Sequence, residues 1–500
     1  MTIIEKLQTN IANYFYFYLF ASILLTLSPV GNLSGNEEMY YGLANKFLNP
    51  SWNGEYSSFI LSGDYRFISD TIIGVMISYF GFENTQIIGS VFTSIIFTHA
   101  ILKLCRILEI DNLYGLLSVI IFILLGQSFI GREWIFEDFE AKIFAYYFVI
   151  LGINQFIINS PYKMAFFLSL ATYFHILVGV SWFGLLALAL LLSDKDYQIS
   201  LKSFFLYSLI CFPIIYLAIN GFNSSGYVYD KSLPSPSYIY SYIRQYKMVV
   251  PFYSISNFVI NWLPGVAVYF GIIISIYLSK KFLQNSIIIR LNTLILSSIS
   301  IIFFFLVISF FDYDGVFAKT YPYRFTSLLL LLILLYSACY LKKEDLNGKM
   351  RIGLFLLIAI TPFFLINGTI NSLTEIKSRY FDSIHKYKLY NYLTENSLPN
   401  EIVLIDNSIE EELYDLERKI NRPTLFTFKY ITSSKKGLIE WYKRKKYKTN
   451  VFAKNMSNEE DYKYNYLILS NNSDLEIFES NHINVYSNEK YTVLVLKLNK

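Results

Sequence analysis

Residues 325–351 have the sequence FTSLLLLLILLYSACYLKKEDLNGKMR. The apolar run 325–341 ends abruptly at a basic cluster formed by Lys342, Lys343, Lys349 and Arg351. A helix of about 17–25 apolar residues can cross a bilayer. Lys and Arg gather in the short loops on the cytoplasmic side of such spans. This stretch therefore predicts a membrane-spanning helix whose C-terminal end faces the cytoplasm.

The same pattern recurs through the first 370 residues and predicts a mainly α, polytopic membrane protein. About eleven spans are expected. They cover 11–30, 86–104, 113–131, 143–159, 163–178, 179–193, 202–219, 257–279, 291–311, 325–341 and 352–370. The pair 163–178 and 179–193 could instead be one bent element.

One further apolar stretch, 67–82 (FISDTIIGVMISYFGF), contains Asp70 and is bounded by Arg66 and Glu83. If it crossed the bilayer, every later loop would change sides and most of the basic loops would be exported, against the positive-inside rule. We therefore expect an amphipathic helix lying in the plane of the outer membrane surface.

This arrangement fixes the expected topology and domains. The N-terminus is cytoplasmic, and residues 1–370 form the membrane domain. Its large loops face outward and cover 31–85, 132–142, 220–256 and 312–324. Residues 371–500 follow as an extracytoplasmic domain.

Composition agrees with this class of protein. The 500 residues are 54% hydrophobic, whereas soluble domains are about 45–50% apolar. The formal net charge of +4 is small, and the basic residues are spread through loops, so no nucleic-acid partner is expected. The three cysteines provide neither a disulfide framework nor zinc-ligand spacing.

The C-terminal domain shows alternating helix and strand patterns. Helices are expected at 386–396, 409–420 and 434–446, and strands at 401–405, 424–429, 466–469, 483–486 and 491–496. This alternation predicts a small α/β domain that ends in an antiparallel hairpin. The basic run Lys443-Arg444-Lys445-Lys446 is expected at a solvated helix end or against anionic headgroups.

The first outer loop carries two adjacent acids, Glu37 and Glu38, directly after the first span. One of them could act as a general base that activates an acceptor hydroxyl. The alternative is structural, because acids are favoured in the first turn of a helix by its dipole.

The second outer loop is short and acidic. Its carboxylates are Glu133, Glu137, Asp138 and Glu140. They could orient a polar headgroup, or Asp138 and Glu140 could help to hold a divalent cation. The alternative is a solvated hairpin whose acids only keep it outside the membrane.

Four further residues are candidates for binding a substrate at the outer surface: His175, Arg244, Lys319 and Arg324. A histidine at membrane depth normally has a partner. An arginine at the head of an apolar helix suits a phosphate or pyrophosphate group. The alternatives are a histidine bonded to the backbone at a helix break and an arginine that snorkels to lipid headgroups.

Several classes of function lack their signatures. The sequence has no Gly-rich phosphate loop, no HExxH and no CxxC motif, which argues against a nucleotide-driven pump. Repeated halves with Gly- or Pro-broken spans at matching positions, typical of secondary transporters, are not visible.

The architecture resembles the GT-C superfamily, polytopic glycosyltransferases that use polyprenyl-phosphate sugars. The stretch Glu37-Glu38-Met39-Tyr40 is similar to the Asp-Glu-x-Tyr opening of protein-mannosyltransferase-type members. The loop 131–140 lies where those enzymes carry a second acidic motif. The first acid of the opening is Glu here rather than Asp, and the His-Pro-Pro of some members is absent from 56–70.

The resemblance implies an inverting glycosyltransferase of a bacterial inner or plasma membrane. A hexosyl or pentosyl group would pass from a polyprenyl-phosphate donor to a glycan, lipid or protein acceptor. Glu37 or Glu38 would be the base, and Arg324, with Arg244, would hold the leaving phosphate. No cofactor is implied beyond the divalent cation that the acidic loop would allow. The alternative is a transporter or flippase of lipid-linked sugars that carries out no chemistry.

Overall fold

The computed structural model describes residues 3–26, 33–54, 57–59, 66–193, 197–223, 232–279, 285–341, 384–431, 434–453, 462–473, 478 and 481–497. The chain divides into two compact units. The helical unit comprises residues 1–28, 87–217 and 240–376, and the mixed unit comprises 29–86, 218–239 and 377–500. Most of the first outer loop thus belongs to the same unit as the C-terminal residues.

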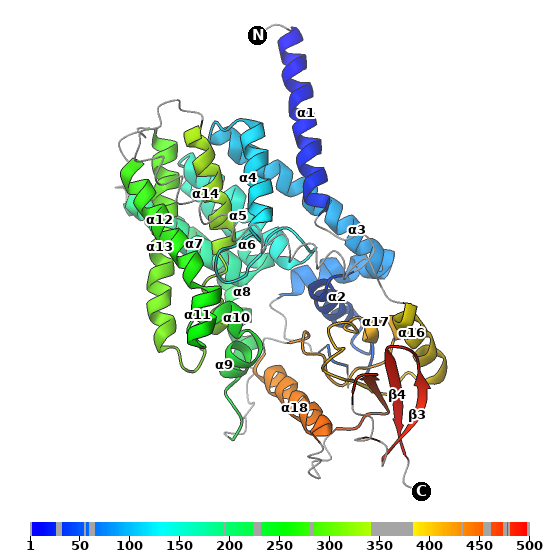
Figure 1. Ribbon diagram of the computed structural model, residues 1–500. Helices are drawn as coiled ribbons and strands as arrows, with labels where there is room; N and C mark the ends of the chain where they lie inside the picture. Colours follow the sequence, from blue (N-terminus) through cyan, green and yellow to red (C-terminus); the bar gives the residue numbers. More distant parts are fainter. Residues whose placement is uncertain are drawn as a thin grey trace. The chain divides into compact units, whose positions relative to one another are not determined.

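The helical unit contains a series of α-helices (Figure 1). They are α1 (Ile3–Thr26), α4 (Asn112–Leu124), α5 (Ala141–Ile157), α6 (Pro161–Phe174), α7 (Ile176–Ser193), α10 (Tyr246–Val249), α11 (Ile255–Asn261), α12 (Leu263–Ser279), α13 (Ser286–Phe311) and α14 (Thr326–Leu341), with a 3₁₀ turn, η4 (Ala318–Thr320). Three elements belong in part to each unit: α3 (Phe67–Ile107), α8 (Tyr197–Asn223) and the π-helix η2 (Ile239–Arg244).

The helical unit is built around α5. Nearly all of its side chains are buried, and a helix that is apolar on every side belongs in the interior of a helical assembly. Helices α6, α7 and α13 pack against it, and α4 packs against α14. These helices share one large apolar core.

The described helices support the prediction of an integral membrane protein. Four of them are long and apolar enough to cross a membrane: α3, α7, α8 and α13. The pair α11 and α12, bent by 49°, would make a fifth. Large apolar side chains on α8, such as Leu201, Phe205 and Phe212, are more than half exposed, as is expected for a helix that faces lipid rather than water.

The number of spans stays a prediction. Every predicted span up to residue 341 coincides at least partly with a helix, and 352–370 lies outside the described residues. Several of these helices are short. The 14 residues of α6 cover only about 21 Å, whereas the hydrocarbon core of a bilayer is about 30 Å thick. Because His175 leaves the helical conformation, 163–193 forms two helices, α6 and α7.

The predicted in-plane helix 67–82 coincides with the first part of α3. Gly81 interrupts α3 with φ 77° and ψ 173°, a conformation that is essentially limited to glycine. The backbone thus breaks α3 close to the predicted end of the in-plane element. The position of this segment in the membrane stays a prediction.

The mixed unit combines helices with one sheet. Its helices are α2 (Gly35–Leu48), α9 (Pro236–Tyr238), α16 (Ile384–Asn396), α17 (Leu416–Ile420) and α18 (Lys435–Phe452). Its strands are β1 (Val403–Ile405), β2 (Tyr466–Ser470), β3 (His482–Ser487) and β4 (Tyr491–Leu496), in the order β1-β2-β4-β3. Strand β1 is parallel to β2, and the other pairs are antiparallel.

Alternate strand residues divide the core of the mixed unit into two apolar layers. Val403 and Ile468 pack with side chains of α16 and α17, whereas Leu404 and Leu467 pack with Leu425 and with α18. The sheet therefore lies between two helical layers. The predicted small α/β fold and its terminal hairpin are confirmed.

Two predicted elements of this domain are wrong. Within the described part of the chain, residues 424–429 form no strand, and a single bridge joins Thr424 to Val403. Side-chain carboxylates take the backbone donors that a strand would need. The N–H of Thr424 donates to Glu417 at 3.1 Å, and that of Phe428 donates to Glu410. The predicted helix 409–420 begins only at Leu416, after a series of turns.

Candidate functional site

Five predicted or neighbouring polar residues meet in the helical unit. Glu133 lies in the loop before α5, Glu140 is the N-cap residue of α5, and Lys142 is in the first turn of that helix. His175 separates α6 from α7, and Arg324 lies two residues before the start of α14. We call Glu133, Glu140, Lys142, His175 and Arg324 the Arg324 cluster. Sequence positions from 133 to 324 thus converge on one place.

Lys142 links two of the four acids of the second outer loop, Glu133 and Glu140. Its Nζ lies 3.2 Å from Oε1 of Glu133 and 3.0 Å from Oε1 of Glu140. The same ammonium lies over the ring of Trp134, 3.0 Å from the ring centroid. All three charged side chains are buried. The loop is therefore a folded, ion-paired structure and not the solvated hairpin that was considered as an alternative.

Arg324 extends this network. Its Nε lies 3.3 Å from Oε2 of Glu133, and its Nη1 lies 2.8 Å from Nε2 of His175. Its guanidinium also covers the ring of Tyr321 at 4.3 Å from the centroid. The Tyr146 hydroxyl donates to the backbone carbonyl of Arg324 at 3.0 Å. The arginine is therefore held in place from several directions and does not snorkel alone to lipid.

The Arg324 contact determines the tautomer of His175. Arginine can only donate, so Nε2 must accept and the proton of a neutral ring must sit on Nδ1. The N–H of Val178 also approaches Nδ1, at 3.4 Å. Both nitrogens of a neutral ring cannot accept, and the shorter bond from a charged donor is the stronger one. The ring that faces Arg324 is therefore neutral.

Negative charge exceeds positive charge around Lys142. Asp138 is buried close to Glu140 and disfavours its ionisation. Burial raises the pKa of the Glu140 carboxyl, Lys142 opposes this effect, and Asp138 adds to it. A buried carboxyl whose pKa is raised by its surroundings is a candidate general acid or base.

Three further predicted residues of this unit are not part of the Arg324 cluster. Glu137 is half-buried in the same loop as Asp138. Arg244, at the end of η2, is half-buried and acts electrostatically on Tyr321, the residue that Arg324 covers. Lys319 lies half-buried in η4.

The acids do not fit the divalent cation that the sequence allowed. Among the described residues, no three His, Cys, Asp or Glu side chains form a group that could hold a metal ion. The ammonium of Lys142 lies 3.0 Å from Glu140, where it already supplies a positive charge. We therefore derive no chemical step through a metal ion at Asp138 and Glu140.

The predicted catalytic acids lie in the mixed unit. Glu37 forms a capping box at the start of α2. The Ser34 hydroxyl accepts from the Glu37 N–H at 3.1 Å, and the Glu37 carboxylate accepts from the Ser34 N–H at 2.9 Å. Glu37 therefore lies in the first turn of a helix, which is the structural role that was considered as the alternative to catalysis. This explains a buried Glu37 by local structure alone.

Glu38 has a different environment. Arg418 donates to its carboxylate from Nε at 2.8 and 2.9 Å and from Nη2 at 2.6 Å. The Nη1 of Arg418 donates to Glu83 at 2.7 Å, and Lys419 donates to the same oxygen of Glu83 at 2.9 Å. Burial raises the pKa of Glu38 against the opposing effect of Arg418. Glu38 is thus a buried carboxylate held by a guanidinium.

Glu417, the residue before Arg418, binds another part of the first outer loop. Its carboxylate accepts from the hydroxyls of Ser57, Ser58 and Thr424 and from the Asn53 amide. Three consecutive residues of the short helix α17, Glu417 to Lys419, therefore connect to residues 53, 57 and 58, to α2 and to α3. We call these three residues the α17 clamp.

Sequence reasoning missed several of these residues. Lys142 stands at the end of the acidic loop in the sequence. A cation next to four acids could have indicated an ion-paired loop. Arg418 offered no such signal. It stands in a polar segment far along the chain, and only the tertiary structure brings it to Glu38.

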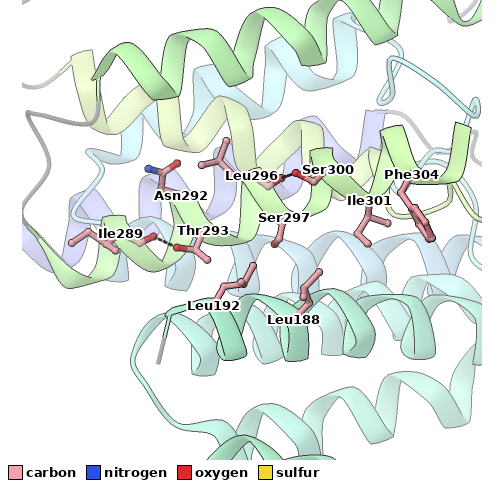
Figure 2. Close-up of a pocket in the computed structure, with 10 residues that line it drawn as sticks. All are labelled: Leu188, Leu192, Ile289, Asn292, Thr293, Leu296, Ser297, Ser300, Ile301 and Phe304. Carbon is pink, nitrogen blue, oxygen red and sulfur yellow. Dashed lines mark hydrogen bonds between the residues drawn. The ribbon is translucent and has the colours of Figure 1, made fainter. Parts of the chain in front are cut away.

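The described cavity of the helical unit is mainly apolar, although Asn292, Thr293, Ser297 and Ser300 are among its lining residues. It has a volume of about 680 Å³ and is lined by Leu188 and Leu192 of α7 and by α13 residues between Ile289 and Phe304. Figure 2 shows both leucines pointing from α7 toward Ser297 of α13. Leu188 is 13 residues beyond His175, about 20 Å along a helix. Since no charged side chain lines it, this cavity suits hydrocarbon and not a reacting group.

These features define the chain as an integral membrane protein with a buried charged cluster and an α/β unit. No family model matches it, and no curated protein sequence matches it. It is similar to the structure of the archaeal oligosaccharyltransferase AglB from Archaeoglobus fulgidus in complex with an inhibitory peptide and a dolichol-phosphate. That similarity has a TM-score of 0.42 and 10% identity, and it covers 92% of this chain and 70% of AglB. So low a score does not establish a shared fold or activity.

Proposed function

We propose that this protein is a membrane glycosyltransferase that takes a sugar from a lipid-phosphate donor, with Arg324 binding the donor's phosphate. The observation that carries the proposal is the Arg324 cluster. A guanidinium within 2.8 Å of His175 is held at the head of an apolar helix in a helical unit. Guanidinium groups bind phosphate oxygens in pairs and stabilise a leaving phosphate electrostatically.

Glu133 occupies the place of an anionic ligand in this arrangement. It lies 3.3 Å from Arg324 and 3.2 Å from Lys142. It can therefore keep its ion pair with Lys142 when a phosphate group replaces it at Arg324. His175 would then be released from Arg324 and could donate to the phosphate from Nε2 after taking up a proton. The mainly apolar cavity between α7 and α13 would accept part of the lipid chain.

The reaction transfers one glycosyl group. The acceptor oxygen forms a bond to the anomeric carbon, the bond from that carbon to the phosphate oxygen breaks, and a carboxylate takes the acceptor's proton. Two carboxyl groups whose pKa is raised by burial are candidates for this base, Glu140 and Glu38. Glu37 is the weaker candidate, because its carboxylate already caps α2. Loss of a true base costs about 10²–10⁴-fold in rate.

Phosphate binding can be tested without knowledge of the sugar. The purified protein in detergent would be titrated with farnesyl phosphate and, as a comparison, farnesol. We expect Arg324→Gln to weaken binding of the phosphate at least about tenfold, with little effect on farnesol. Glu133→Gln should tighten phosphate binding, because it removes the internal competitor. Arg132→Gln is the matched control, since Arg132 is exposed and bonds Asn261.

Unchanged phosphate binding by Arg324→Gln would refute the site. The alternative function, a transporter or flippase, makes a different prediction about products. A transferase incubated with a polyprenyl-phosphate sugar and acceptor releases polyprenyl phosphate, whereas a flippase leaves the sugar–phosphate bond intact. Product analysis with Glu140→Gln and Glu38→Gln, normalised to the amount of folded protein because loss of Glu38 also destabilises the fold, would then identify the base. Normal turnover in both variants would exclude both acids.

A further inference from the structure

Helix α18 carries many more bases than acids. Its basic residues are Lys435, Lys436, Lys443, Arg444, Lys445, Lys446 and Lys448, and its only acid is Glu440. The sequence suggested that the run 443–446 lies at a helix end, but α18 continues to Phe452. The basic run is therefore in the middle of the helix, where position around the axis decides which side chains face outward.

The inward-facing bases are neutralised within the fold. Arg444 is buried, lies 2.8 Å from Glu440 and donates to the backbone carbonyl of Ser57 at 3.0 Å. Lys448 is buried and paired with Glu410. Glu440, which pairs with Arg444, is the one acid in the sequence of α18. The helix therefore contains no second acid that could neutralise the charge of its outward-facing lysines.

Four lysines of α18 are exposed: Lys435, Lys436, Lys443 and Lys446. The interval from Lys436 to Lys443 is seven residues and that from Lys443 to Lys446 is three, so these side chains lie on one side of an α-helix. Lys435 and Lys446, eleven residues apart, fall on the same side. We call these four lysines the basic face of α18.

We propose that the basic face of α18 binds the anionic headgroups of membrane lipids. Charge complementarity supports this partner, because clusters of four or more Lys or Arg residues bind anionic bilayers. The place of α18 in the chain supports it as well. The helix packs against α9, and α9 lies in sequence between α8 and the bent pair α11–α12, which can cross a membrane. This proposal is independent of the proposed glycosyl transfer.

Lysine acetylation in lipid nanodiscs tests the proposal on the full chain. The protein would be placed in nanodiscs of phosphatidylcholine alone or with about one third phosphatidylglycerol, and the acetylation rate of each lysine would be measured by mass spectrometry. We expect the rates at Lys436, Lys443 and Lys446 to fall at least about threefold with phosphatidylglycerol. High salt should restore them, because it screens exposed charges.

Two exposed lysines elsewhere in the mixed unit, Lys388 and Lys497, are internal controls and should keep their rates. In the variant Lys436→Gln/Lys443→Gln/Lys446→Gln, acetylation of Lys435 should no longer depend on phosphatidylglycerol. Equal rates in both kinds of nanodisc, or equal protection of the control lysines, would overturn the proposal. Protection by soluble polyglutamate but not by phosphatidylglycerol would also overturn it and assign the face to an acidic polymer.

Discussion

Arg418 binds the carboxylate of Glu38 through two of its nitrogens, at 2.6–2.9 Å, although 380 positions separate the two residues. The side chain of Glu38 is 1% exposed and that of Arg418 is 7% exposed. A buried pair of this kind contributes little net stability when both partners are present, but removal of one partner leaves an uncompensated charge. The pair therefore ties the start of α2 to α17 in a way that mutation can measure.

Arg418→Gln should destabilise the protein strongly. The substitution leaves Glu38 buried without its guanidinium, and a broken buried pair typically costs about 3–5 kcal/mol. Thermal unfolding of the purified protein in detergent would show the loss. Glu38→Gln should also destabilise it, because it leaves the arginine uncompensated.

The double variant Glu38→Gln/Arg418→Gln separates the pair from general damage. Two neutral amides remove both buried charges, so the loss should be smaller than the sum of the two single losses. An additive result would mean that the two side chains do not depend on each other.

Glu417→Gln should loosen the segment 57–59. The Glu417 carboxylate accepts from several hydroxyl and amide donors, and hydrogen bonds to a charged group contribute about 1.5–3 kcal/mol each. A glutamine side chain has one acceptor oxygen instead of two, and its NH₂ group would face the hydroxyl and amide donors that bind Glu417. Hydrogen exchange at residues 57–59 should become faster. Glu411→Gln, at an exposed position of the same segment, should leave that exchange unchanged.

The parts of the fold that local patterns determine could be predicted from the sequence. Apolar runs gave the positions of α8, α13 and α14, because a span needs only length and hydrophobicity. Arg324 and His175 were both identified as candidates. Arg324 was expected to face a phosphate or lipid headgroups, and His175 an acid, a phosphate or the backbone at a helix break. Their contact at 2.8 Å joins two helix ends 149 positions apart, and no periodicity encodes such a distance.

The errors in the C-terminal domain have the same origin. Residues 424–429 have the composition of a strand, but Glu417 and Glu410 supply acceptors for their N–H groups from elsewhere in the unit. A carboxylate competes with a ladder partner only after the tertiary structure has brought it there. Local propensity cannot anticipate that competition.

Acid should weaken the mixed unit through His482. Burial lowers the pKa of this histidine below 6.5. Its Nδ1 donates to the carbonyl of Phe478 at 3.2 Å, and its Nε2 accepts from the Tyr464 hydroxyl at 3.0 Å, so the neutral ring is the bonded form. Below about pH 6.5 the unfolded chain takes up a proton that the folded ring does not, and folding is penalised.

The stability of wild-type protein should therefore fall as the pH drops from 7.5 through 6.5 toward the lower pKa of the folded histidine. Amide exchange in β3 and β4 at each pH measures this directly. The variant His482→Asn lacks the titrating ring and should show a smaller change over the same range. An identical pH dependence in both proteins would assign the effect to other groups.

Gly81→Ala should destabilise α3 through the backbone alone. Gly81 has φ 77°, and a Cβ built there meets no atom within 4 Å. No steric clash adds to the cost, so the expected loss of about 1–3 kcal/mol is that of holding alanine in a conformation reserved for glycine. Gly184→Ala is the matched control, because Gly184 also has open space but lies inside α7. Alanine is favoured over glycine within a helix by about 0.5–1 kcal/mol, so this variant should unfold at a higher temperature. An unchanged or raised unfolding temperature of Gly81→Ala would mean that the break at Gly81 is not a requirement of the fold.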